Sequence, residues 1–166
     1  IILTLIYPNK KYYNDKLFKI SFSLVFLLLI QIIYGAFVAG LDAGKIYNTW
    51  PKMNEKWIAE SVYAMTPFWK NFTEGLAGIQ FVHRTLAFII LILVIYFYKS
   101  AKKINLEKKD MNAINTVSII VLLQIFFGIL ALINSVPIWL GSIHQILAFL
   151  LLATSVYCVF IFKKTV

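Results

Sequence analysis

Two histidines are the residues of this chain whose type and setting point most directly to chemistry. His83 and His144 are the only histidines in the sequence, and each begins the same motif, His-x-x-Leu-Ala-Phe, inside an apolar run. Neutral imidazole costs less to bury than other titratable groups, and it is a common metal ligand. We therefore interpret the pair as candidate axial ligands, provided that the surrounding elements bring the two rings together.

The composition predicts that those elements are membrane-spanning helices. Of the 166 residues, 61% are hydrophobic and 14% are charged, whereas soluble domains have about 45–50% apolar and about 25% charged residues. Apolar runs of about 20 residues predict transmembrane helices, because lipid offers the backbone no other hydrogen-bonding partner. We expect an all-α membrane protein, a four-helix bundle with helices at about residues 20–39, 76–98, 114–134 and 138–162.

The distribution of lysines predicts the orientation of these helices. Eleven lysines precede the first helix, lie between the second and third, or follow the fourth, whereas the loop of about residues 40–75 holds four lysines and four acids. The positive-inside rule places the first set in the cytoplasm, or in the matrix of a mitochondrion. The net charge of +9 is thus a topology signal, and no nucleic-acid partner is expected. We interpret the four tryptophans as outer interfacial anchors: Trp50, Trp57, Trp69 and Trp139.

A repeat relates the four predicted helices. Gln31-x-x-x-Gly35 in the first helix recurs as Gln124-x-x-x-Gly128 in the third, and the histidine motif of the second helix recurs in the fourth. Two such hairpins pointing the same way make a parallel repeat about an axis along the membrane normal. We interpret the two glycines as small residues at helix–helix contacts.

The repeat places both histidines at the same depth, on the order of 10 Å below the outer ends of their helices. Two imidazoles on facing helices are a common way to hold a haem. The alternative is that each histidine only hydrogen-bonds a neighbouring helix, and its recurrence in a repeated motif favours haem. Arg84 could pair with a haem propionate or reach toward the headgroups, and the sequence leaves both open. No Asp or Glu lies inside the predicted spans, so no general acid or base is expected there.

The loop after the first helix resembles a distinctive stretch of haem A synthases. Residues 39–53 read AGLDAGKIYNTWPKM, and the segments Phe81-Val82-His83-Arg84 and Ile143-His144-Gln145 also follow the family pattern. The resemblance covers essentially the whole chain. It is to the mitochondrial and alphaproteobacterial branch, which lacks the pair of outer-loop cysteines found in Gram-positive relatives.

This resemblance implies the C-terminal half of an eight-helix protein built from two pseudosymmetric halves. Residues 1–7 would end the preceding helix, and residues 8–166 would form the haem-binding domain. In the family this half binds haem b through the positions that match His83 and His144, whereas the other half holds haem O and a catalytic glutamate. The family oxidises a methyl group of haem O through hydroxylation to the formyl group of haem A, for cytochrome c oxidase. This half alone, with no catalytic residue of its own, is expected to bind haem without turnover.

Two other functions stay open at this point. One is a free-standing electron-transfer cytochrome b, and the other is a structural or assembly membrane protein whose histidines only pack. The chain begins without a methionine, which favours part of an enzyme over a complete small cytochrome. The expected location is the bacterial plasma membrane or the mitochondrial inner membrane, and the family suggests haem O synthase as a partner besides lipid and haem O. We also hypothesise that the loop of about residues 40–75 caps the haem site.

Overall fold

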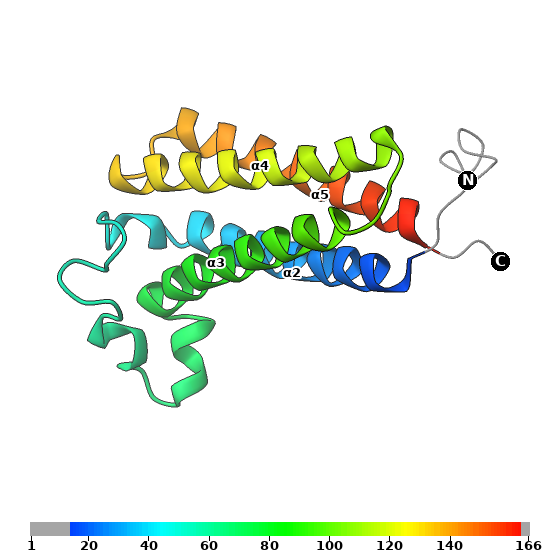
Figure 1. Ribbon diagram of the computed structural model, residues 1–166. Helices are drawn as coiled ribbons and strands as arrows, with labels where there is room; N and C mark the ends of the chain where they lie inside the picture. Colours follow the sequence, from blue (N-terminus) through cyan, green and yellow to red (C-terminus); the bar gives the residue numbers. More distant parts are fainter. Residues whose placement is uncertain (1–13, 164–166) are drawn as a thin grey trace.

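Four long helices form an antiparallel bundle (Figure 1) in the computed structural model, which describes residues 14–163. They are α2 (Asp15–Gly40), α3 (Leu76–Ala101), α4 (Lys108–Ile133) and α5 (Ile138–Phe162). Each is long and apolar enough to cross a membrane. Within residues 14–163 there is no β-strand, only one isolated bridge. The predicted all-α membrane fold is therefore confirmed, whereas the predicted end of an earlier helix at residues 1–7 lies outside the described residues.

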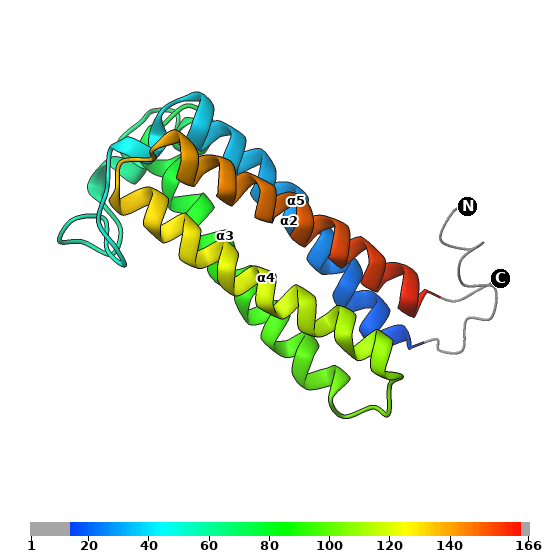
Figure 2. The same cartoon turned by 90° about the horizontal axis from the view of Figure 1, so that it is seen from above.

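The helices pack in the cyclic order α2, α3, α4, α5, so that α3 and α5 are diagonal to each other. The long segment 41–75 and the short α4–α5 turn lie at one end of the bundle (Figure 2). The α3–α4 connection, the start of α2 and the end of α5 lie at the other end. Helices α2–α3 and α4–α5 thus form two hairpins whose connections share one end, which we call the outer end.

Two helices begin earlier than the apolar runs predict. Helix α2 begins at Asp15 rather than near residue 20, because the Asn14 side chain accepts a hydrogen bond from the backbone of Leu17 at 2.9 Å. Helix α4 begins at Lys108 rather than near residue 114. Asp110 therefore lies in the first turn of the helix rather than in a loop, and its side chain is buried. Apolar runs mark the part of a helix that lies in lipid, whereas capping residues and charged first turns mark where it starts.

The apolar core fills the inner half of the bundle, away from the long loop. It combines the first halves of α2 and α4 with the second halves of α3 and α5. Phe97 and Phe162 are fully buried there and meet edge to face at 6.1 Å between ring centroids. Between helices in lipid, such side chains stabilise the bundle through van der Waals packing rather than through removal from water. The inner half therefore supplies much of the tight packing, and the outer half is left for polar side chains.

The outer segment is built from three short 3-10 helices: η1 (Ala43–Lys45), η2 (Glu60–Tyr63) and η3 (Phe68–Phe72). Asn71, which is fully buried, organises the last two. Its Oδ1 accepts from the backbone of Met65 at 2.9 Å, and its Nδ2 donates to the carbonyl of Phe68 at 2.8 Å. The segment then packs directly on the start of α3, where a Cβ on Gly78 would lie only 2.0 Å from the Asn71 carbonyl oxygen.

That close approach makes a Gly78→Ala substitution destabilising. The added methyl group meets backbone, which cannot move aside as a side chain can, so we expect a loss of about 1–3 kcal/mol. Thermal unfolding in detergent, followed by tryptophan fluorescence, measures it. Gly141→Ala in α5 is the matched control, because a Cβ there meets nothing within 4 Å. A Gly78→Ala protein as stable as the control would contradict the packing of η3 on α3.

Candidate functional site

His83 and His144 meet inside the outer half of the bundle. His83 is the eighth residue of α3 and His144 the seventh of α5, so each lies about 10 Å from the outer end of its helix. Their ring centroids are 6.4 Å apart, and the ring planes are inclined at 69°. The structure therefore brings together the two residues that the repeat singled out, from diagonal helices.

Each imidazole contacts the glutamine of the other helix in its hairpin. Nε2 of Gln31 lies 3.4 Å from Nε2 of His83 and donates to the His83 carbonyl oxygen at 3.1 Å. Nε2 of Gln124 lies 3.2 Å from Nε2 of His144. Both glutamines stand nine residues before the last residue of their helix. The two repeated sequence motifs are thus in direct contact, which the sequence alone did not predict.

The two glycines of the repeat lie against the same rings. A Cβ on Gly128 would come within 2.8 Å of Cε1 of His144, and one on Gly35 within 3.2 Å of Cε1 of His83. The sequence predicted only that these two glycines lie at helix–helix contacts. In the structure each glycine lies against one particular side chain, the imidazole of the neighbouring helix. The missing side chain makes room for the imidazole of the neighbouring helix.

Several buried polar atoms around the rings have no hydrogen-bond partner among the described residues. They are Nδ1 of both histidines and Oε1 of both glutamines. An unpaired buried polar group costs about 1–3 kcal/mol, so a cluster of four calls for further partners, which water or a ligand could supply.

The separation of the two rings can be compared with that of two imidazoles bound to one metal ion. At a metal–nitrogen distance of about 2 Å on each side, the centroids of two imidazoles are roughly 6 Å apart, close to the observed 6.4 Å. Turning either ring about its metal–nitrogen bond leaves that separation unchanged. Residues 14–163 contain no group of three or more His, Cys, Asp or Glu side chains that would suggest another kind of metal centre. A cofactor that needs two axial ligands matches this donor set.

Arg84 and Gln80, on the same face of α3 as His83, hold the outer segment in place. Gln80 is 2% exposed, and its Nε2 donates to the Ala43 carbonyl at 2.9 Å. The two amino groups of Arg84 donate to three carbonyls of the segment and to Oε1 of Gln80. These carbonyls belong to Tyr47 at 2.7 Å, Thr49 at 3.1 Å and Lys52 at 3.3 Å.

Through these contacts Arg84 anchors the outer loop. The sequence had suggested two other roles, pairing with a haem propionate or reaching toward the headgroups. Both of its amino groups are engaged with the protein, and Nε is buried without a partner. The loop that it holds is the stretch on which the family resemblance most depends. Two further contacts fix that loop: Asn48 donates to the Leu132 carbonyl at 2.7 Å, and Trp50 stacks on Phe88 at 5.4 Å. The loop is therefore tied to the outer ends of α3 and α4.

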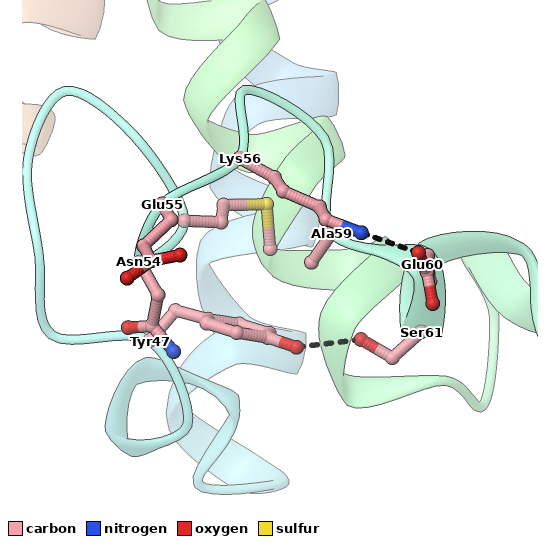
Figure 3. Close-up of a pocket in the computed structure, with 8 residues that line it drawn as sticks. Tyr47, Asn54, Glu55, Lys56, Ala59, Glu60 and Ser61 are labelled. Atoms are coloured by element: carbon pink, nitrogen blue, oxygen red, sulfur yellow. Dashed lines mark hydrogen bonds and ion pairs between the residues drawn. The ribbon is translucent and has the colours of Figure 1, made fainter.

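A pocket of about 470 Å³ lies within the outer segment (Figure 3), not between the histidines. Its polar walls are the Tyr47 hydroxyl, 2.7 Å from the Ser61 hydroxyl, and the Lys56–Glu60 ion pair. Hydrogen bonding and charge attraction within that pair raise the pKa of Lys56 and lower the pKa of Glu60. Both side chains of the pair are exposed and already bonded to each other, and Asn54 and Glu55 also line the pocket.

The glycine contacts predict how alanine substitutions affect the rings. Gly128→Ala should displace the His144 ring. Gly35→Ala should displace the His83 ring less, because the distance from the added Cβ to Cε1 of the ring is 0.4 Å longer there. With only two histidines in the chain, selective ¹⁵N-histidine labelling resolves each imidazole by NMR. Gly40→Ala is the control, as a Cβ there meets nothing within 4 Å. An unmoved His144 signal in Gly128→Ala would show that the glycine does not set the ring position.

The Arg84 contacts predict the behaviour of the loop. Arg84→Ala removes donors to three carbonyls, so trypsin should cleave at Lys45 and Lys52 at least several-fold faster in detergent. Thr85→Ala is the control, since the exposed Thr85 hydroxyl bonds only to the Phe81 carbonyl of its own helix. Equal cleavage rates in the two variants would mean that other contacts suffice to hold the loop.

Comparisons with known proteins identify the family of the chain. The profile of a family described as "Cytochrome oxidase assembly protein" matches residues 2–156. The "Heme A synthase" of Flavobacterium psychrophilum is 43% identical over 99% of this chain and 49% of its own length. The protein of the same name from Flavobacterium johnsoniae is 42% identical over 95% of this chain and 47% of its own length. That from Wolbachia pipientis is 36% identical over 94% of this chain and 41% of its own length. No solved structure matches the chain.

The chain spans about half the length of the curated relatives that it matches. The matched residues include both histidines, both glutamines and the loop held by Arg84. The family resemblance seen in the sequence is thus confirmed, and together with four membrane-length helices it indicates a multi-pass membrane protein. Because the match runs through nearly every described residue, the chain belongs to the haem A synthase family of cytochrome oxidase assembly proteins.

Proposed function

We propose that this chain is the C-terminal, haem-binding part of a haem A synthase, with His83 and His144 as the axial ligands of a haem b. The observation that carries the proposal is the pair of imidazoles, 6.4 Å apart between centroids, that meet from diagonal helices. Their unpaired Nδ1 atoms and the two glycines that make room for the rings support it.

Bound between these residues, haem b would supply one-electron transfer. Held by His83 and His144, such a group would be suited to electron transfer rather than to binding of oxygen or substrate at the iron. The one buried carboxylate within residues 14–163 is Asp110, at the inner end of α4 and so at the opposite end from the histidines.

For the full-length protein we propose oxidation of the methyl group of haem O, through hydroxylation, to the formyl group of haem A, for cytochrome c oxidase. Haem O would bind in a second four-helix half, related to this one within an eight-helix protein. The identity to relatives about twice as long supports that arrangement. Haem O synthase would supply the substrate, in a bacterial plasma membrane or a mitochondrial inner membrane. This chain alone would hold haem b without turnover.

The ligand assignment predicts the absorption spectrum. The chain purified from membranes should show a low-spin, bis-histidine haem b spectrum in its oxidised and reduced forms. His83→Ala and His144→Ala should each abolish it or convert it to a high-spin spectrum, because one axial position is lost.

Gln145→Ala is the matched control for these variants, since Gln145 is exposed and adjacent to His144 in α5. A folded, helical but colourless wild-type chain would argue against a haem site in this part of the protein. A correct spectrum in a full-length protein that does not convert haem O to haem A would favour an electron-transfer cytochrome instead.

A further inference from the structure

We propose that Gln31 competes with haem iron for His83, so that His144 is the first ligand available to haem and His83 the second. The inference rests on the proposed function, because it assigns a role toward the same haem. It concerns a residue that the sequence identified only as part of a repeated motif. Gln31 and Gln124 occupy equivalent positions in the two hairpins, yet their contacts differ.

Two contacts fix the amide of Gln31. Its Nε2 donates to the His83 carbonyl oxygen at 3.1 Å and lies 3.4 Å from Nε2 of the His83 ring. The bond to the carbonyl identifies this end of the amide as the NH₂ group, because an amide oxygen would repel a carbonyl oxygen there. An NH₂ group only donates, so Nε2 of His83 accepts and the ring carries its proton on Nδ1. The one lone pair of this neutral imidazole is therefore already occupied.

Iron at either nitrogen of the His83 ring requires Gln31 to move. At Nε2, a metal would need the lone pair that accepts the amide proton. At Nδ1, the ring proton would first have to pass to Nε2, and that N–H would then point at the NH₂ group, donor against donor. Turning the ring over does not free Nε2, since it would then take the place of Cε1 against Gly35, where a Cβ would already lie within 3.2 Å of the ring. The observed contact and an iron bond to His83 thus exclude each other.

The other histidine, His144, is held less firmly. Nε2 of Gln124 lies 3.2 Å from Nε2 of His144, and Oε1 of Gln124 is buried without a partner among residues 14–163. This amide can turn or withdraw by giving up one contact, whereas the amide of Gln31 must give up two. The apparent affinity for a ligand falls with the fraction of protein that is competent to bind it. The difference between the two glutamines therefore predicts an order of binding, His144 before His83.

The competing contact has a physical reason in the haem-free protein. An imidazole lone pair that is buried at membrane depth without a donor is costly. The Gln31 amide supplies that donor without placing a charge in lipid. In net terms a hydrogen bond of this kind is equivalent to about threefold to tenfold in an equilibrium constant. Gln31 therefore stabilises the empty site and delays the bond between iron and His83 without preventing it.

The first measurement is the uptake of ferric haem b by the haem-free chain in detergent, followed by stopped-flow absorption. The wild type should show a high-spin spectrum first and a low-spin spectrum second, and His83→Ala should not pass beyond the high-spin stage. Gln31→Leu should speed the second phase about threefold to tenfold, because no amide has to leave the ring. Gln124→Leu, the same change in the other hairpin, should leave the second phase unchanged. So should Gln145→Leu, at an exposed glutamine beside His144.

The second measurement does not depend on a variant at position 31. In the haem-free chain with ¹⁵N-labelled histidine, the His83 ring should appear as one tautomer, protonated on Nδ1, with the signal assigned from a His144→Ala sample. A His83 ring protonated on Nε2 would overturn the inference. A wild type that binds haem with a second phase no slower than that of Gln31→Leu would also overturn it, and would leave the proposed function standing. If neither protein binds haem, the proposed function fails together with the inference.

Discussion

The outer half of the bundle depends on one constraint: polar side chains placed in lipid must find their partners within the protein. Water does not reach that depth, and an unpaired polar group in hydrocarbon is costly. The two glutamine–histidine contacts and the carbonyl bonds of Gln80 and Arg84 meet this constraint. They leave one nitrogen of each imidazole without a partner among residues 14–163.

Stability and function are separated along the length of the same four helices. The inner half is closed by apolar packing around Phe97 and Phe162. That packing fixes the position of the helices, so the outer half needs no large apolar core of its own. Helix α3 contributes to the apolar packing and to the histidine pair. Its buried Ile90 and Val94 lie toward the inner end, and His83 lies toward the outer end. A rigid inner half is what allows two side chains on diagonal helices to hold a constant separation.

The sequence was sufficient for the features that depend on composition and local pattern. The four helices follow from apolar runs, and the importance of His83 and His144 follows from a repeated motif. The sequence was insufficient for features that depend on which side chains contact each other. The contact of Gln31 with His83 needs the pairing of two helices to be known. The buried position of Asp110 needs the start of α4 to be known, and that start lies in a charged first turn outside the apolar run.

Arg84 illustrates why a charged residue in such a helix is hard to interpret from sequence. An arginine beside a candidate ligand histidine suggests a cofactor contact, yet its two amino groups bind the outer loop and Gln80. Residues 80, 83 and 84 share one face of α3, because positions three and four apart in a helix are neighbours. The helix that presents the imidazole is therefore the helix that anchors the loop. The contacts that hold the loop therefore lie on the same face of α3 as His83.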